Sequence, residues 1–480
     1  MFEKTFNNID KILRNEDDCS TELDYIEQTS WLLFLKYLDD VENDKKIASE
    51  LSGIKYVKTL EDRFTWSSWA SPKKENGEID LHSAQTGDDL VNFVEEELFP
   101  YLKNLNKDSN VSEYKNKLSV IFSELKNKIG SGYNLRAMID LIDTLRFRSQ
   151  EERHEMSVLY ESRINRMGNA GRNGGEYYTP RPLIKTIIKI IDPKVGQTIY
   201  DGACGSAGFL CEAYNFFRKK KNLSAKELEF INKSSLFGKE KKPLAFIVGL
   251  INMILHGVES PNIVRKNTLK ENIRNINDED RFDVILANPP FGSDEVAEVE
   301  QNFPIKSSEP AYLFLQHFIK ILKTDGSAGI VIKNTFLSNS DAKNIRKELF
   351  ETCNVHTILD LPEKVFQAGQ KTIVLFFKKG IPTKKIWFYE LKLNRNLGKT
   401  NPLNDKDLHD FEETSKTKLE SENSWNISID DIDKKTWDLS VNNPNRVENE
   451  DSRSPEEILT EIDSIDKEIN DALKAIRNVL

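Results

Sequence analysis

Four residues that follow a strand-like run constrain this chain most. The apolar run Phe282 to Ala287 is followed directly by Asn288, Pro289, Pro290 and Phe291. This pattern predicts a strand whose carboxyl end carries an amide, two rigid residues and an aromatic ring. Because proline has no N–H group and fixes φ, the carbonyl groups at this strand end should stay presented to a ligand.

The chemistry of these four residues suits an exocyclic amine on a planar ring. Such an amine is a poor nucleophile, because its lone pair is delocalised into the ring, and hydrogen-bond acceptors activate it. The side-chain carbonyl of Asn288 and the backbone carbonyl of Pro289 would accept the two N–H groups, while Phe291 stacks on the ring. An ordinary Pro-Pro turn after a strand would use the same residues. Other parts of the sequence are therefore needed to distinguish an amine-binding site from such a turn.

A strand, loop and helix signal lies upstream. Gln197 to Asp201 predicts a short buried strand, and the small residues Gly202 to Gly208 predict a turn that opens a helix. Glycines let the backbone approach a ligand, and a helix N-terminus offers free N–H groups, although a tight strand-to-helix turn uses the same residues. Asp201 favours S-adenosylmethionine over a dinucleotide, because a carboxylate suits an ammonium group better than a phosphate.

Two later strand ends add polar groups. Leu236 to Glu240 predicts a strand that ends in an acid suited to ribose hydroxyls, although Glu240 would also fit a solvated, lysine-rich turn. Asn267 closes a third strand-like stretch and is a candidate for contact with the adenine of the cofactor. Ligands of parallel sheets bind beyond the carboxyl ends of the strands, so we expect Asp201, Glu240 and Asn288 to lie at one edge.

The segment Gly174 to Arg181 precedes these signals and contains Thr179 and Pro180, directly before the apolar helical run Leu183 to Ile191. On its own, Thr-Pro at this place predicts only a helix start. In chain order, however, residues 175–181, 201–209 and 288–291 resemble the three signature motifs of γ-class DNA amino-methyltransferases.

The resemblance covers nearly the whole chain. Stretches at residues 25–40, 313–317 and 361–377 resemble the modification (M) subunit of type I restriction-modification systems. This resemblance implies methylation of adenine N6 in double-stranded DNA, with S-adenosylmethionine as the donor. It also implies a Rossmann-like α/β methyltransferase sheet.

The resemblance and the strand ends together define the predicted site. The catalytic residues are Asn288, Pro289, Pro290 and Phe291, and the cofactor-binding residues are Glu176, Tyr177, Tyr178, Thr179, Pro180, Arg181, Asp201, Gly205, Ser206, Ala207, Glu240 and Asn267. The chain departs from the family at Gly202, where proline is usual, and at Ala207 and Lys364, where glycine is usual. The methyl group of Ala207 would slightly crowd the cofactor.

Two other functions fit part of the pattern. A protein-glutamine methyltransferase also uses Asn-Pro-Pro-aromatic on a planar amide, but it does not need the Thr-Pro element or the terminal helix described below. A scaffold that kept the fold and lost the chemistry is disfavoured, because every polar group that the chemistry needs is present.

We expect three regions. Residues 1–165 should form an all-helical domain with a loop around 71–77, in which Trp66 and Trp69 pack in the core or, less favourably, stack on DNA. Residues 166–395 should form the catalytic domain, with a mostly parallel sheet covered by helices on both faces. Residues 396–480 should form a C-terminal region.

The C-terminal region ends in a helix predicted at 455–480. Apolar residues recur in it at alternating spacings of four and three, which is the pattern of a coiled-coil seam: Ile458, Ile462, Ile465, Ile469, Ala472, Ile476 and Val479. The helix would either pack on its own domain or, as the resemblance implies, dock on a specificity (S) subunit, with two M subunits per S subunit. A restriction (R) subunit is a further possible partner.

The net charge of −10 is unfavourable for binding DNA, so the required cations must be local or supplied by a partner. Several cations lie close together in the sequence and would form either a solvated helix face or a DNA-facing patch: Arg163, Arg166, Arg172, Arg181, Lys185 and Lys189. The chain has no Walker A loop and no segment large enough to read a DNA sequence, so we expect both functions in other subunits.

The 4 cysteines and 6 histidines show neither Cys-x-x-Cys nor His-x-x-x-His spacing, so we expect reduced thiols and no metal. No apolar run approaches the length of a membrane span, and the N-terminus lacks the pattern of a signal peptide. We therefore expect a cytoplasmic protein.

Overall fold

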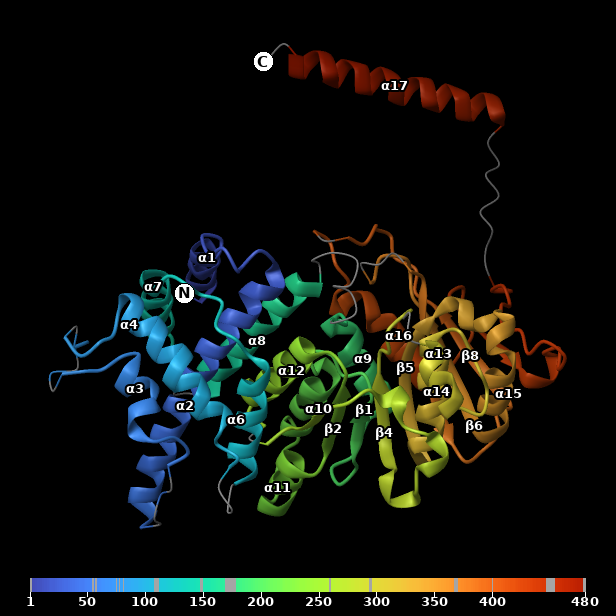
Figure 1. Cartoon of the computed structure of the whole chain (residues 1–480). Coiled ribbons are helices and arrows are strands. Elements are labelled where there is room, and N and C mark those ends of the chain that lie inside the picture. The colour runs from blue at the N-terminus through green and yellow to red at the C-terminus, as the bar shows by residue number, and fades with distance from the viewer. Residues whose placement is uncertain are drawn as a thin grey trace.

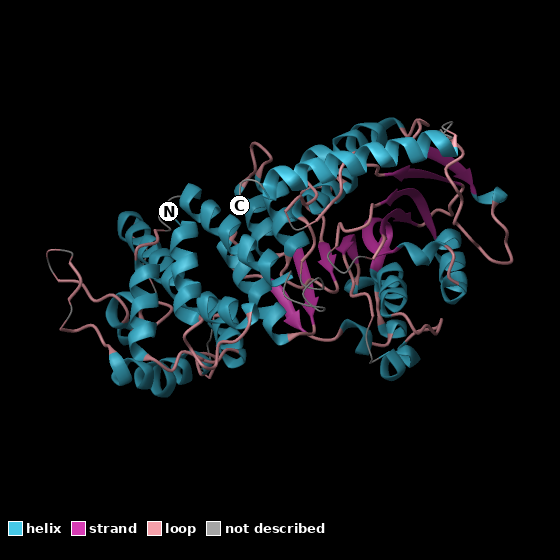
Figure 2. Ribbon diagram, turned by 90° about the horizontal axis from the view of Figure 1, so that it is seen from above, coloured by secondary structure: helices cyan, strands magenta, loops and turns pink. Residues whose placement is uncertain are grey.

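The computed structural model describes the chain except for residues 1, 54, 55, 57, 75, 77, 81, 108–111, 147–149, 169–177, 259, 293–295, 367–369, 399, 446–453 and 478–480. A helical half and an α/β half lie side by side, and a final helix lies apart from both (Figure 1). From above, the strands are confined to one half of the molecule (Figure 2). Glu176 and Tyr177 of the predicted site lie outside the described residues.

The N-terminal half is built from helices, as predicted. They are α1 (Phe2–Leu13), α2 (Glu22–Ser52), α3 (Trp66–Trp69), α4 (Gly87–Asn92), α5 (Phe99–Lys103), α6 (Glu113–Glu124), α7 (Gly132–Asp143) and α8 (Gln150–Gly168). The long helix α2 begins at a capping box on Thr21 and ends at Gly53, whose φ of 69° is left-handed. Trp66 and Trp69 are 2% and 3% exposed and pack edge to face, which confirms their core role.

Within the described residues, the C-terminal half contains one nine-stranded sheet in the order β3-β2-β1-β4-β5-β7-β6-β8-β9. The strands are β1 (Ile199–Asp201), β2 (Leu236–Glu240), β3 (Asn262–Arg265), β4 (Phe282–Ala287), β5 (Leu322–Lys333), β6 (Cys353–Asp360), β7 (Thr372–Lys379), β8 (Lys385–Glu390) and β9 (Ser424–Ser428). The neighbouring strands β3, β2, β1, β4 and β5 run parallel to one another, whereas β7 and β9 are antiparallel to their neighbours. The sheet is therefore mixed.

Helices cover both faces of the sheet. They are α9 (Arg181–Ile191), α10 (Gly208–Arg218), α11 (Ala225–Lys233), α12 (Pro243–Leu255), α13 (Val296–Val299), α14 (Pro310–Ile321), α15 (Lys343–Thr352) and α16 (His409–Thr417). In β4, Val284 and Leu286 belong to one apolar core, and Ile285 and Ala287 belong to another. Since successive strand side chains point to opposite faces, both faces are buried, and the predicted α/β class is confirmed.

One of these cores joins the two halves. It runs without interruption from the helical half into the face of the sheet covered by α9, α10 and α12. Helix α12 packs against α2, α6 and α8, and the hydroxyl of Tyr37 on α2 donates to the carbonyl of Ile254 at 3.2 Å. The helical half is thus part of the support of the sheet.

The sheet continues beyond residue 395, where we had predicted the end of the catalytic domain, because β9 pairs with β8. The backbone N–H of Leu439 then donates to the carbonyl of Leu337 at 2.9 Å.

Helix α17 (Pro455–Arg477) lies apart from this body (Figure 1). Ile462, Ile465 and Ile469 on it are 49 to 51% exposed, and the coiled-coil pairing stays a prediction. In the described part of the chain, no helix is long and apolar enough to cross a membrane.

Candidate active site

Three predicted side chains lie at one edge of the sheet. Asp201 is the last residue of β1, Glu240 is the last residue of β2, and Asn288 directly follows β4. These strands are neighbours and run parallel, so their carboxyl ends meet. The predicted placement is confirmed.

The turn from Gly202 to Gly208 is held by Glu240. One carboxylate oxygen accepts from the N–H of Gly205 at 2.9 Å, and the other accepts from the N–H of Lys242 at 2.7 Å. The N–H of Lys241 also faces this carboxylate, and because a carboxylate has about four lone-pair sites, it can accept from a ribose hydroxyl as well. Glu240 therefore supports the turn in addition to the cofactor role predicted for it.

Positive φ angles explain why glycine is usual in the family at two positions where this chain has Ala207 and Lys364. Ala207, at the start of α10, has φ of 62°, and Lys364 has φ of 65°. Both lie in the left-handed region, where only glycine is free of a Cβ penalty. The third departure, Gly202, lies in a crowded place, since a Cβ built there would be 2.9 Å from the ring of Phe318.

Three residues support the turn from behind in a way that the sequence analysis did not predict. A Cβ on Gly249 of α12 would lie 2.8 Å from the carbonyl oxygen of Gly205, so only glycine lets this helix approach so closely. The side chain of Asn252 donates to the carbonyl of Ser206 at 2.9 Å, and the hydroxyl of Thr268 donates to the carbonyl of Gly202 at 2.6 Å. A lone asparagine in the apolar run of α12 was the signal that would have found Asn252.

Asp201 lies in the interior, 1% exposed, and accepts from the N–H of Ala203 at 3.1 Å. Burial, together with the nearby Glu240, raises the pKa of Asp201 to about 8. A cationic group placed beside it would favour the charged carboxylate. This environment suits the ammonium group that we predicted as its partner.

The amide of Asn288 is held by its nitrogen. Its Nδ2 donates to the hydroxyl of Thr179 at 3.0 Å, and its Oδ1 is buried with no partner among the described residues. Phe291 is half-buried and packs edge to face with Phe366, the ring centroids being 6.2 Å apart. The free acceptor and the aromatic rings are the groups that a planar amine needs.

The remaining predicted cofactor residues differ in their surroundings. Tyr178, Thr179 and Pro180 are half-buried directly before α9, and Ser206 is 4% exposed. Asn267 accepts from the N–H of Leu269 at 3.0 Å and so caps the short turn after β3.

Two of the six cations in the predicted patch are buried, so the patch is wrong at these two positions. The guanidinium of Arg163 is buried against Asp10, and that of Arg181 is buried between Glu161 and the carbonyl of Gly208. The partner of Arg163 lies 153 residues away in the chain, and the partner of Arg181 lies 20 residues away on a different helix, so the spacing of the cations did not reveal them. Lys189 bonds to Glu412, and the side chain of Arg166 and the whole of Arg172 lie outside the described residues.

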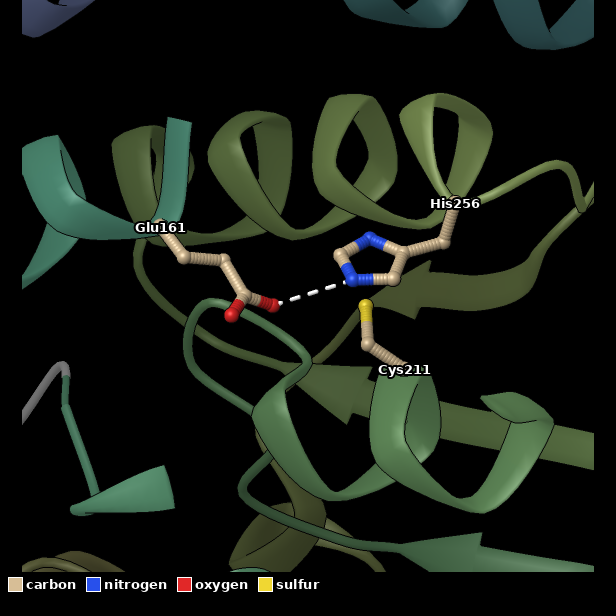
Figure 3. Close-up of side chains that lie close together, drawn as sticks. All are labelled: Glu161, Cys211 and His256. Atoms are coloured by element: carbon tan, nitrogen blue, oxygen red, sulfur yellow. Dashed lines mark ion pairs between the residues drawn. The ribbon is translucent and has the colours of Figure 1, made fainter. Parts of the chain in front are cut away.

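The structure also brings together a group that we did not anticipate. Glu161, Cys211 and His256 point toward one another (Figure 3), and their ligand-type atoms all lie within 4.8 Å. All four cysteines are free and buried.

Two family models match the chain. A model described as N-6 DNA Methylase matches residues 151–453, and one described as HsdM N-terminal domain matches residues 3–142. The Type I restriction enzyme EcoEI methylase subunit of Escherichia coli is 33% identical, over 98% of this chain and 95% of that protein. The EcoKI methylase subunit of Escherichia coli strain K12 is 31% identical, over 62% of this chain and 60% of that protein.

Solved structures agree. The modification subunit of a putative type I restriction enzyme from Vibrio vulnificus YJ016 superposes with a TM-score of 0.82 at 31% identity, covering 92% of this chain and 96% of that chain. A chain from a structure of type I R-M complex assembly and conformational transition superposes with a TM-score of 0.78 at 32% identity. The match covers 100% of this chain and 98% of that chain. Together with the strand-end site, these matches confirm the predicted relationship: the chain belongs to the N-6 DNA methylase family, among the methylase subunits of type I restriction-modification systems.

Proposed function

We propose that this protein transfers a methyl group from S-adenosylmethionine to N6 of an adenine in double-stranded DNA, as the modification subunit of a type I restriction-modification complex. The observation that carries the proposal is the Oδ1 of Asn288, a buried acceptor without a partner among the described residues, at the sheet edge shared with Asp201 and Glu240.

Asp201, Glu240 and the turn around Gly205 fit the cofactor. The buried carboxyl of Asp201 would meet the ammonium group, and the carboxylate of Glu240 would meet the ribose hydroxyls. Residues 176–181, Ser206, Ala207 and Asn267 would complete the pocket. When bound, S-adenosylmethionine supplies an electrophilic methyl group.

The chain's own residues act on the adenine. Flipping the base out of the duplex costs a few kcal/mol, and stacking on Phe291 offsets part of that cost. Oδ1 of Asn288 and the carbonyl of Pro289 accept the two N6–H groups and hold the nitrogen in line for a direct displacement, which raises the rate by orientation. The surplus proton leaves an already cationic nitrogen, so the residues need not include a strong base.

We also propose the division of labour in the complex. The helical domain supports the catalytic sheet, α17 docks on the specificity subunit, and that subunit selects the DNA sequence. Two modification subunits would serve one specificity subunit, with a restriction subunit as a further partner. Because the proposed substrate is DNA, we also propose a cytoplasmic location for the assembly.

Replacing Asn288 with alanine tests the proposal. Loss of one preorganised hydrogen-bond partner should lower methyl transfer by at least about a hundredfold, or roughly 3 kcal/mol, because the acceptor acts on the target amine. Binding of S-adenosylmethionine, measured by calorimetry, should change little. The matched control is Asn262→Ala, which removes a half-buried amide bonded to Lys233 at the start of β3.

Tritiated methyl incorporation into DNA and into a glutamine-containing peptide, by the complex with its specificity subunit, gives the substrate class. Full activity of the Asn288→Ala complex would refute the assigned role. Transfer to the peptide instead of DNA would favour a protein-glutamine methyltransferase.

A further inference from the structure

The cluster of Glu161, Cys211 and His256 joins the two halves of the molecule behind the cofactor turn. Glu161 comes from α8 of the helical half, Cys211 lies in the first turn of α10, and His256 follows α12 (Figure 3). Nε2 of His256 lies 3.1 Å from Oε1 of Glu161, and Cys211 is fully buried. A carboxylate, a thiol and an imidazole are also the ligands that zinc prefers.

Arg181 already supplies the positive charge that a metal would bring. Its guanidinium donates to the same Oε1 of Glu161 that faces His256. Although burial opposes the effect, Arg181 and His256 hold the pKa of Glu161 below its usual range. A divalent cation at this place would be repelled by a buried guanidinium a few ångströms away. The cluster is therefore better explained as a hydrogen-bonded ion network.

This network reaches the cofactor turn along two arms. In the first arm, Arg181 donates to the carbonyl of Gly208, at the end of the turn. In the second arm, Nδ1 of His256 donates to the backbone carbonyl of Asn252 at 2.8 Å, and the side chain of Asn252 donates to the carbonyl of Ser206 at 2.9 Å. Both arms meet at the carboxylate of Glu161.

The first arm also leads to the catalytic amide. Arg181 follows Pro180 and Thr179, and the hydroxyl of Thr179 accepts the hydrogen bond from Asn288. Fixing Arg181 thus restrains the short segment that holds this amide. The carboxylate that anchors the segment lies on α8, outside the sheet and its own helices.

We infer that Glu161 is a positioning residue of the cofactor site, through which helix α8 of the N-terminal half sets the affinity for S-adenosylmethionine. Glu161 acts through Arg181 and His256, and it orients the carbonyl groups of Ser206 and Gly208. The inference rests on the proposed function, since it assumes that the turn binds this cofactor.

A second ion pair on α8 provides a matched control. Arg163, two residues beyond Glu161, forms a buried, bidentate pair with Asp10 of α1, and its guanidinium lies over the ring of Phe6 at 5.1 Å. Asp10→Asn and Glu161→Gln remove the same kind of charge from the same helix packing. Of the two carboxylates, Glu161 is the one whose partners Arg181 and His256 lead to the cofactor turn within the described residues.

Binding of S-adenosylmethionine to the full-length variants, measured by calorimetry, tests the inference. Both variants should unfold at lower urea concentration. Glu161→Gln should weaken cofactor binding on the order of tenfold, which is the effect of losing one charge-assisted hydrogen bond. Asp10→Asn should bind like the wild type. In the complex with the specificity subunit, Glu161→Gln should raise KM for the cofactor more than it lowers kcat.

Equal cofactor affinity of Glu161→Gln and wild type, or an equal loss in Asp10→Asn, would overturn the inference. If Glu161→Gln does not fold, Glu161→Asp keeps the charge with a shorter reach and should show an intermediate loss of affinity. One zinc ion per wild-type chain by mass spectrometry, lost in Cys211→Ala, would show a metal site instead. If the wild type itself does not bind the cofactor, the proposed function fails rather than this inference.

Discussion

Thr179 orients the side-chain amide of Asn288. Nδ2 donates to the threonine hydroxyl at 3.0 Å, and Oδ1 stays buried without a partner in the described part of the chain. A buried acceptor without a hydrogen bond costs about 1–3 kcal/mol, which an incoming N–H group would recover. The fold therefore keeps the catalytic amide in a state that favours an amine.

Replacing Thr179 with valine should lower kcat on the order of tenfold, because a freed amide no longer presents its oxygen in one direction. Thr179→Ser keeps the hydroxyl and should retain most of the activity. Methyl incorporation at saturating cofactor measures kcat apart from any change in cofactor binding. A valine variant with wild-type kcat would show that Thr179 does not orient Asn288.

The buried Asp201 predicts a pH dependence of cofactor binding. Its pKa of about 8 means that the folded protein holds a proton there at neutral pH. An ammonium partner requires the carboxylate, so binding should release this proton. Affinity for S-adenosylmethionine should rise by up to about tenfold per pH unit between about pH 6 and 7.5. Calorimetry in two buffers of different ionisation enthalpy would measure the released proton.

The same shift has a consequence for stability, with the opposite sign. The pKa of Asp201 rises from 3.8 to about 8 on folding. Its contribution to the free energy of unfolding is therefore fully present below pH 3.8 and is lost as the pH rises toward 8. Asp201→Asn cannot titrate and should flatten both the binding curve and this part of the stability curve. A variant with an unchanged pH dependence of binding would remove Asp201 from the site.

Ala207 should be a strained position. Its φ of 62° lies in the left-handed region, which costs a residue with a Cβ roughly 1–2 kcal/mol. Ala207→Gly should therefore raise the free energy of unfolding by about 0.5–1 kcal/mol in urea denaturation, after allowance for the freer unfolded chain. Ala213→Gly, inside α10, is the control and should destabilise by about 1 kcal/mol. Destabilisation by Ala207→Gly would contradict the strain.

Local pattern predicted the strand ends of the site. The apolar run before Asn288, the acid that ends β2 and the small residues after Asp201 each lie within one short segment, so their spacing alone placed them at the carboxyl edge. The same spacing predicted the strands now seen in β4, β5 and β7. It did not predict that β7 runs antiparallel, because an apolar strand buried on both faces has the same pattern in either direction.

Contacts between different helices explain what the sequence did not show. Arg163 and Arg181 resembled a surface patch because each was read beside other cations, whereas their carboxylates lie at Asp10 and Glu161. Asn252 supports the turn from a helix that begins well after it. Such contacts depend on how helices pack, and no local period encodes that packing.

The last prediction concerns α17, whose isoleucines Ile462, Ile465 and Ile469 are half exposed on a helix that lies apart from the body of the protein (Figure 1). Burying such a seam against a partner helix gains about 25 cal/mol per Å² of apolar surface, which favours docking over exposure. A chain without residues 455–480 should still fold and bind S-adenosylmethionine, but it should elute separately from the specificity subunit in size-exclusion chromatography. Replacing the three isoleucines with aspartate keeps the helix length and should have the same effect. Co-elution of either variant with the specificity subunit would show that the subunits meet through another surface.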